Sequence, residues 1–197
     1  MNEKPYHHGD LRTALMEKAI EMIDDMGVHA LSLRKVAVAC GVSHAAPYAH
    51  FANKEELLRD IEKHITGQFA AALKKSVKEV GETPEGLVEL GCAFVMFFTR
   101  NRQYYNLIYN YLGIQAGGDH AYEPYDFFVG FIFKMLERMD YPEALRGKTF
   151  GAHFAVIQGI TALAVIDSCK SDSEWEAIAR DLLTSNYLLT KKPTGVE

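Results

Sequence analysis

The segment LSLRKVAVACGVSHAAPYAHFANK, residues 31–54, constrains the fold most, because its pattern favours two short helices joined by a tight turn. Ser32 can cap a first helix whose apolar residues recur at helical spacing. Gly41 follows that helix as a left-handed C-cap would, and Ser43 can cap a second helix running to about Phe51. The segment contains no acidic residue, although the whole chain has 26 Asp plus Glu against 21 Lys plus Arg. It therefore predicts a compact helical pair with a basic surface.

Two short helices around a glycine-containing turn form a helix-turn-helix, whose second helix enters a DNA major groove. At the start of that helix, His44 can donate a hydrogen bond to a purine, and the methyl groups of Ala45 and Ala46 can touch a thymine methyl. The competing interpretation is two small helix formers beside a solvated histidine. The net charge of −5 does not exclude DNA binding, because the positive footprint is local. Its uncompensated cations are Arg34, Lys35 and Lys54.

With the lead-in Tyr6-His7-His8-Gly9-Asp10-Leu11-Arg12, this segment resembles the DNA-binding domain of the TetR family of bacterial transcriptional repressors, over about residues 6–66. The matching residues are Ser32-Leu33-Arg34, Val36-Ala37, Gly41-Val42-Ser43, Tyr48-x-His50-Phe51 and Lys54-Glu55-x-Leu57-Leu58. The resemblance implies that Arg34 reaches a guanine or a phosphate. It also implies that Tyr48, His50 and Lys54 hold backbone phosphates. The predicted DNA-binding set is Arg34, Lys35, Ser43, His44, Ala45, Ala46, Tyr48, His50 and Lys54.

Two details qualify the resemblance. The N-terminal wording is similar to one subgroup of the family, marked near its C-terminus by Trp-x-x-x-His-Gly, but the corresponding place here reads Phe154-Ala-Val-Ile-Gln158-Gly159. Both hallmark side chains are therefore changed. Pro47 would occupy the fourth position of the reading helix, where it removes a helix hydrogen bond. We therefore expect a short or bent reading helix.

The rest of the chain shows apolar residues at helical spacing and no segment that alternates at period two, so we predict an all-α fold of about nine helices. A DNA-binding domain (6–66) would pass, inside the fourth helix, into a ligand-binding and dimerisation domain (67–190). Helix ends are expected at Asp10 and Gly27 for the first helix, at Asn53 and Gly81 for the fourth, and at Thr83-Pro84 for the start of the fifth. A sixth segment over 102–112 is followed by a Gly113–Asp119 loop. Asp140 and Pro142 precede the eighth helix, and Ser173-x-x-Glu176 is a capping box for the ninth.

The stretch 94–133 is crowded with aromatic residues, several of them tyrosines whose hydroxyls need partners. A stripe of Phe at helical spacing is most often core, and that interpretation stays open for each residue. Aromatic walls with few polar groups also describe a small-molecule pocket, and the resemblance implies an inducer pocket in this part of the chain. The candidates are Phe94, Phe97, Phe98, Tyr104, Tyr105, Tyr109, Phe128 and Phe131. Such a lining favours an apolar or aromatic effector.

Small residues recur at every fourth position near the C-terminus and would permit close approach of another helix. Close packing within the chain would explain this ridge equally well. A DNA reader with one short basic segment needs a second copy for affinity, however, and a two-fold dimer supplies it. We therefore predict a homodimer through the last two long helices, with an interface that includes Gly151, Ala155, Gly159, Trp175, Ile178, Leu182 and Leu189.

Catalytic motifs are absent from the sequence. It contains no Gly-x-Ser-x-Gly, phosphate loop, His-Glu-x-x-His or dinucleotide fingerprint, so we expect no enzyme, no catalytic residue and no cofactor. His7-His8 with Asp10 rarely converge on one ion, and the three cysteines lie far apart, so no metal site or disulfide is expected. No apolar run of about 18 residues and no signal peptide are recognised, which fits the cytoplasm.

The sequence therefore predicts a cytoplasmic, ligand-responsive DNA-binding transcriptional regulator. The resemblance implies a repressor that releases operator DNA when a small apolar or aromatic effector binds the C-terminal domain. A DNA-binding or interaction protein without an effector is the alternative, and a small-molecule enzyme is less favoured.

Overall fold

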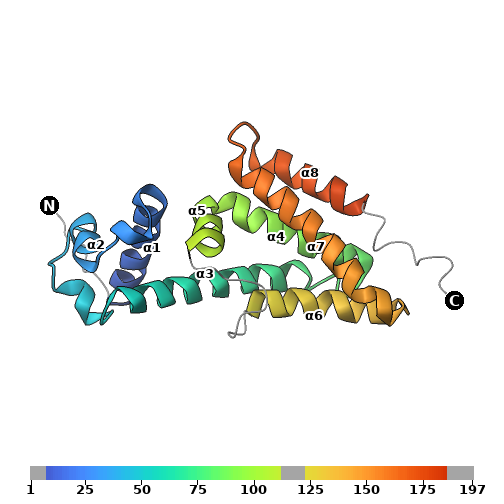
Figure 1. The fold of residues 1–197 in the computed structure, drawn as a ribbon, viewed down its shortest axis with the longest axis horizontal. Coiled ribbons are helices and arrows are strands. Elements are labelled where there is room, and N and C mark those ends of the chain that lie inside the picture. The colour runs from blue at the N-terminus through green and yellow to red at the C-terminus, as the bar shows by residue number, and fades with distance from the viewer. Residues whose placement is uncertain (1–7, 112–122, 186–197) are drawn as a thin grey trace. The chain divides into compact units, whose positions relative to one another are not determined.

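The structure is a computed structural model that describes residues 8–111 and 123–185, with the side chains of 11–109 and 123–185. All regular structure in these ranges is helical (Figure 1), which confirms the all-α class. The elements are α1 (His8–Met26), η1 (Val28–Ala30), α2 (Leu33–Ala39), η2 (Ala46–Ala49), α3 (Lys54–Ser76), α4 (Pro84–Arg100), α5 (Arg102–Asn106), η3 (Leu107–Tyr111), α6 (Glu123–Arg138), α7 (Glu143–Ile166) and α8 (Asp172–Thr184). The segments η1 and η2 are 3₁₀-helices and η3 is a π-helix.

The chain divides into two compact units. The first, called the head below, comprises Met1–Ile65 and Gln103–Gln115. The second, called the body, comprises Thr66–Arg102 and Ala116–Glu197. The helix α3 therefore begins in the head and ends in the body. The return of the chain to the head at Gln103 has no signal in the sequence.

The predicted helix-turn-helix signals of the head are present. The hydroxyl of Ser32 accepts a hydrogen bond from the Lys35 amide at 3.3 Å and so caps α2. Gly41 adopts a positive φ of 69° directly after that helix, where a residue with a Cβ atom would be strained. Asn53 caps α3 by accepting from the Glu56 amide at 2.8 Å.

The reading helix differs most from the expected form. It is confirmed as short, because the only regular structure between the turn and α3 is the four-residue 3₁₀-helix η2. Ala45 rather than Ser43 occupies the N-cap position, and Ser43 contributes only its carbonyl, which accepts from the Ala46 amide at 3.0 Å. Pro47 has no amide hydrogen with which to continue an α-helical hydrogen-bond pattern from Ser43. The described chain therefore has eight α-helices and not nine.

Some expected helix ends are shifted. Asp10 lies inside α1, which already begins at His8, and so it is not the N-cap. The capping box of α8 is formed by Ser171 and Glu174, because two overlapping Ser-x-x-Glu patterns occur here and the helix begins at the earlier one. The expected Gly113–Asp119 loop lies outside the described residues, as does Leu189.

The core of the body is formed where α4 packs against α7 and α8. Gly91 makes this approach possible, since a Cβ atom there would lie 2.7 Å from Cδ1 of Leu183 and 3.2 Å from Cδ1 of Ile157. Thr83 caps α4 by accepting from the Gly86 amide at 3.0 Å, as predicted. These contacts fix α8 along α4.

The helix α7 is more apolar than the sequence analysis assumed. Its 24 residues include an 18-residue window with a mean hydropathy of 1.6, so by length and composition this described helix could cross a membrane. Only 33% of that window is buried. A large apolar surface of α7 therefore faces out of the described chain.

Candidate nucleic-acid interface

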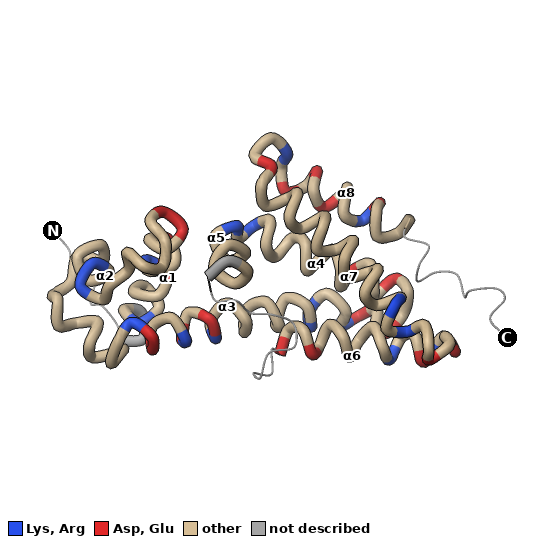
Figure 2. The backbone as a smooth tube through the Cα atoms, viewed as in Figure 1, with Lys and Arg blue, Asp and Glu red and all other residues tan. Residues whose placement is uncertain are grey.

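The basic residues of α2 lie on its first turn. Figure 2 shows Lys and Arg but no Asp or Glu along this helix. Arg34 is exposed, and within the described residues no hydrogen bond or ion pair holds its guanidinium. Lys35 is also exposed, and its ammonium donates to the carbonyl of Ala30 at 2.8 Å. Arg34 is therefore wholly available for an external anion, and the Lys35 ammonium keeps further donors for one.

The reading segment presents several of the predicted contact residues to solvent. Ser43, His44 and Ala45 are exposed, and the phenol of Tyr48 is 51% exposed. Ala46 and His50 are half-buried. The exposed set combines a hydrogen-bonding imidazole, a methyl group and a phenol, which suits base edges and phosphates.

Arg12 supports the reading segment from α1, a role that the sequence analysis did not assign. Its guanidinium forms an ion pair with Asp60 of α3 and donates to the carbonyl of His50 at 3.3 Å. It also lies 5.0 Å from the ring centre of Phe51, which is buried. Arg12 thus connects the end of the reading segment to two helices. Its presence in the matching lead-in was the only signal in the sequence.

Lys54 occupies a different environment from the one expected. Its ammonium donates to the carbonyl of Val28 at 2.6 Å and is partly buried. This contact ties the start of α3 to the 3₁₀-helix between α1 and α2. An ammonium has three donors, so contact with a phosphate stays a prediction, but Lys54 also has a structural role.

A polar network joins α5 to the rest of the head. The Tyr104 hydroxyl is hydrogen-bonded to Glu17, whose carboxylate also lies 3.0 Å from Nε2 of His64. Burial, followed by the neighbouring Glu17 charge, raises the pKa of Tyr104. Asn106 donates to Asp24 of α1 at 3.1 Å. The segment that returns from the body is therefore held on α1 by two polar contacts.

The candidate pocket residues are divided between the two units. Tyr104, Tyr105 and Tyr109 belong to the head, and the five phenylalanines belong to the body. The rings of Phe94, Phe97 and Phe98 all lie within 4.8–5.0 Å of the ring of Phe69 on α3. Phe128 and Phe154 join the ring of Phe94 at 5.6 and 6.0 Å, and Phe131 is buried in the same unit. The described phenylalanines pack against one another, and their role in binding an effector stays a prediction.

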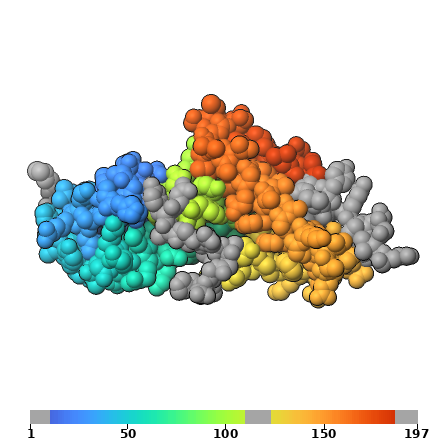
Figure 3. Space-filling view, in the orientation of Figure 1, coloured from blue at the N-terminus to red at the C-terminus, as the bar shows by residue number. Residues whose placement is uncertain are grey.

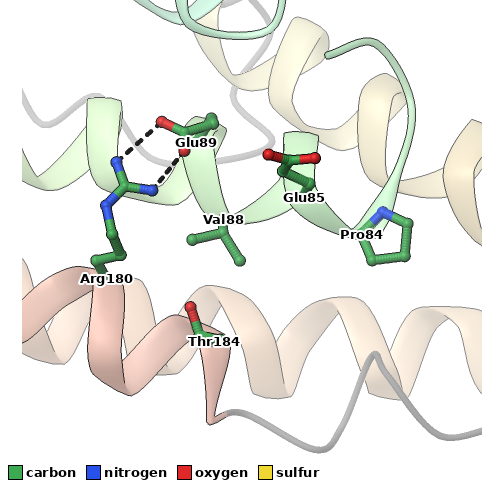
Figure 4. A pocket seen from close by; sticks show the side chains of 6 residues that line it. All are labelled: Pro84, Glu85, Val88, Glu89, Arg180 and Thr184. Carbon is green, nitrogen blue, oxygen red and sulfur yellow. Dashed lines mark hydrogen bonds and ion pairs between the residues drawn. The ribbon is translucent and has the colours of Figure 1, made fainter.

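A groove of about 340 Å³ lies elsewhere in the body, between α4 and α8 (Figure 4). Glu89 and Arg180 form an ion pair across it, and Glu85, Val88 and Thr184 line it further. The paired guanidinium lowers the pKa of Glu89. None of the described residues that line this groove is aromatic, so the groove does not match the predicted effector pocket.

The small-residue ridge of α7 is exposed. Gly147, Gly151, Ala155 and Gly159 follow one another at four-residue spacing and all face solvent. A Cβ atom at any of the three glycines would meet no other atom within 4 Å, so close packing within the described chain does not explain the ridge. Leu163 continues it and is 60% exposed.

Exposed apolar residues on both C-terminal helices extend this face. Ile166 is 77% exposed at the end of α7 and Leu182 is 46% exposed on α8. In the space-filling view α7 (orange) and α8 (red-orange) form a continuous surface of the body (Figure 3). Trp175, by contrast, is only 7% exposed and Ile178 is half-buried. Trp175 is therefore mainly part of the core of its own chain.

Comparison with known proteins places the N-terminal part of the chain among regulators. The sequence profile of "Bacterial regulatory proteins, tetR family" matches residues 15–61. The fatty acid metabolism regulator protein of Bacillus subtilis (strain 168) is 32% identical over 73 residues, which are 37% of this chain and 38% of that protein. The chain thus matches little more than a third of the length of this relative.

Solved structures extend the similarity to nearly the whole chain. A protein of unknown function from Rhodococcus sp. RHA1 is 28% identical, with a TM-score of 0.68 over 92% of this chain and 97% of the other. AibR, solved in complex with isovaleryl coenzyme A and operator DNA, is 19% identical, with a TM-score of 0.67 over 88% and 98% of the two chains. At such identity the second likeness establishes a shared fold.

Proposed function

We propose that this chain, whose residues 15–61 match the tetR family of bacterial regulatory proteins, is a cytoplasmic, homodimeric repressor that releases operator DNA when an apolar effector binds the body. The proposal rests on the set of exposed groups that the head presents. The head combines a Ser32-capped α2 with the exposed Arg34, a turn at Gly41 and a reading segment in which His44 and Tyr48 are exposed. Such a unit presents base-reading and phosphate-binding groups together.

The exposed ridge of α7 supports the homodimer. Glycines and alanine at four-residue spacing allow the backbone of a second helix to approach closely, and Leu163 and Ile166 would lose their exposed apolar surface in the same contact. Two heads must lie about 34–36 Å apart to enter successive major grooves, so each copy reads one half-site. Burial in a dimer also accounts for the apolar composition of α7.

Two of the covalent connections between the units lie within the described residues and can carry an effector signal to the head. One is α3, and the other is the passage from Arg102 in the body to Gln103 in the head. Arg102 donates to the carbonyl of Asp167 at 2.7 Å, at the end of α7, while Tyr104 is hydrogen-bonded to Glu17 of α1. A change in the body at α7 can therefore shift the residues that hold α1. The effector needs only to favour the non-binding state by differential affinity.

The aromatic residues of the body and the known relatives both point to an effector with an acyl chain. The body offers an aromatic cluster, one relative regulates fatty acid metabolism, and a structural neighbour was solved with an acyl-coenzyme A. An acyl chain would enter by separating rings that now pack together, which means that it selects an open form of the body. The mutual packing of those rings is also the observation that favours the alternative, a DNA-binding protein without an effector.

The test combines DNA selection with ligand titration. The protein should enrich a two-fold symmetric sequence from a randomised duplex library, and isovaleryl-coenzyme A or longer acyl-coenzyme A thioesters should lower its affinity for that duplex at least about tenfold, or about 1.4 kcal/mol of coupling. Tyr104→Phe, which keeps the ring and removes the hydroxyl that bonds Glu17, should reduce this coupling. No enriched sequence would contradict the DNA-binding proposal. Enrichment without any thermal shift by the thioesters would favour the effector-free alternative.

A further inference from the structure

The head has an apolar hollow whose exposed residues Met26 and Val38 have no part in the proposed function. It is open to solvent, has a volume of about 370 Å³ and is lined by Met22, Met26, Arg34, Lys35, Val38, Ala39 and His44. Met26, the last residue of α1, is 48% exposed, and Val38, the last residue but one of α2, is 64% exposed. Two large apolar side chains from different helices are therefore exposed at one place.

The charges around this hollow have one sign. Arg34 and Lys35 stand among its lining residues together with His44, and no acidic residue lines it. Lys35 is held in place by its hydrogen bond to Ala30. The chain as a whole carries a net charge of −5, so an acidic partner would be repelled by the molecule in general and attracted here.

We propose that this hollow binds an acidic amphipathic helix of a partner protein, whose apolar residues enter between Met26 and Val38 and whose carboxylates pair with Arg34 and Lys35. Methionine side chains adapt to varied apolar partners, and a groove of this kind accepts helix residues at i, i+3 and i+7. The two cations that would pair with the partner are also assigned to DNA. Occupancy therefore excludes operator DNA, and this exclusion, unlike the binding itself, rests on the proposed function.

The probe is a fluorescent helical peptide of about 14 residues with Leu at i, i+3 and i+7 and Glu between them. Two control peptides carry Lys for each Glu or Ser for each Leu. The full-length protein should bind the first peptide and bind both controls at least about tenfold more weakly. A random-sequence duplex of about 30 base pairs at low salt should displace the bound peptide.

Variants separate the hollow from the DNA contacts. Replacing both Met26 and Val38 by Ser should weaken peptide binding at least about tenfold and leave duplex binding within about twofold, because both side chains are exposed and neither belongs to the predicted DNA-binding set. Arg34→Ser should weaken the binding of both the peptide and the duplex. Arg59→Ser, at an exposed arginine on α3 outside the hollow, is the matched control and should weaken neither.

Three results would overturn the proposal. These are equal binding of the acidic and control peptides, peptide binding that ignores the double substitution, and an equal loss of duplex and peptide affinity in the double variant. The last would identify the hollow as a DNA-contact surface. Peptide binding without any duplex binding would instead leave the partner site in place and contradict the proposed function. A complex of protein, peptide and duplex together would refute the mutual exclusion.

Discussion

The ammonium of Lys54, the first residue of α3, donates a 2.6 Å hydrogen bond to the carbonyl of Val28 in η1. Lys54→Met should therefore destabilise the head by about 1–2 kcal/mol, because a partly buried carbonyl loses a charged donor. Urea unfolding followed by circular dichroism measures the change. Arg59→Met serves as the control, since Arg59 is exposed on the same helix. An unchanged unfolding midpoint with a flatter salt dependence of DNA binding would show instead that Lys54 serves phosphates alone.

Two exposed residues of the reading segment should affect DNA binding differently. His44→Ala should relax preference at one position of each half-site by about 1–3 kcal/mol, because a hydrogen bond to a base edge is lost. Tyr48→Phe should weaken binding to all sequences alike by about 1 kcal/mol, because a phosphate contact carries no sequence information. Competition binding across a randomised operator measures both. A specificity change in Tyr48→Phe, or none in His44→Ala, would reverse these assignments.

Leu163 tests the dimer face. It is 60% exposed on the ridge of α7, so Leu163→Glu should leave the fold of one chain intact and convert the dimer to a monomer, since a buried carboxylate on the two-fold interface would face its own copy. Sedimentation velocity gives the mass. Phe133→Ser removes an exposed apolar side chain from α6 and should remain dimeric. A wild-type protein that sediments as a monomer on and off DNA would end the dimer proposal.

His153 of α7 should make stability depend on pH. Burial of its side chain lowers the pKa of His153 to about 4, below its usual 6.5, because the charged form is poorly solvated. The unfolded chain then binds the proton more tightly than the folded one, so stability falls as the pH drops from about 6.5 toward about 4. The loss from this group reaches about 2 kcal/mol at about pH 5.

The His153 prediction is checked by the slope of stability against pH rather than by its absolute value. His153→Leu and His153→Gln should both flatten the curve between about pH 6.5 and pH 5, whatever each costs at neutral pH. His29, which is exposed in η1, provides the control substitution His29→Gln. A slope unchanged in both His153 variants would show that this histidine is not responsible.

Helix ends were predictable where the cap and its partner lie within one turn of each other. Ser32, Asn53 and Thr83 cap α2, α3 and α4 as their sequence patterns indicate, and Gly41 takes the positive φ that its position requires. Where two capping patterns overlap, as at the start of α8, the sequence does not show which of the two serines is the cap. The choice of Ser171 over Ser173 depends on where α8 begins, and α8 begins where it meets α4.

The sequence by itself determined the all-α class, the helix-turn-helix and the resemblance to the tetR family, because caps, periodicity and motif residues act over a few positions. Only the tertiary structure decided that Tyr104 meets Glu17, that Arg12 supports the reading segment, and that the ridge from Gly147 to Gly159 is exposed while Trp175 is buried. These facts depend on contacts between residues far apart in the chain. Helical spacing shows which residues share a face, but what that face packs against follows from how all the helices come together.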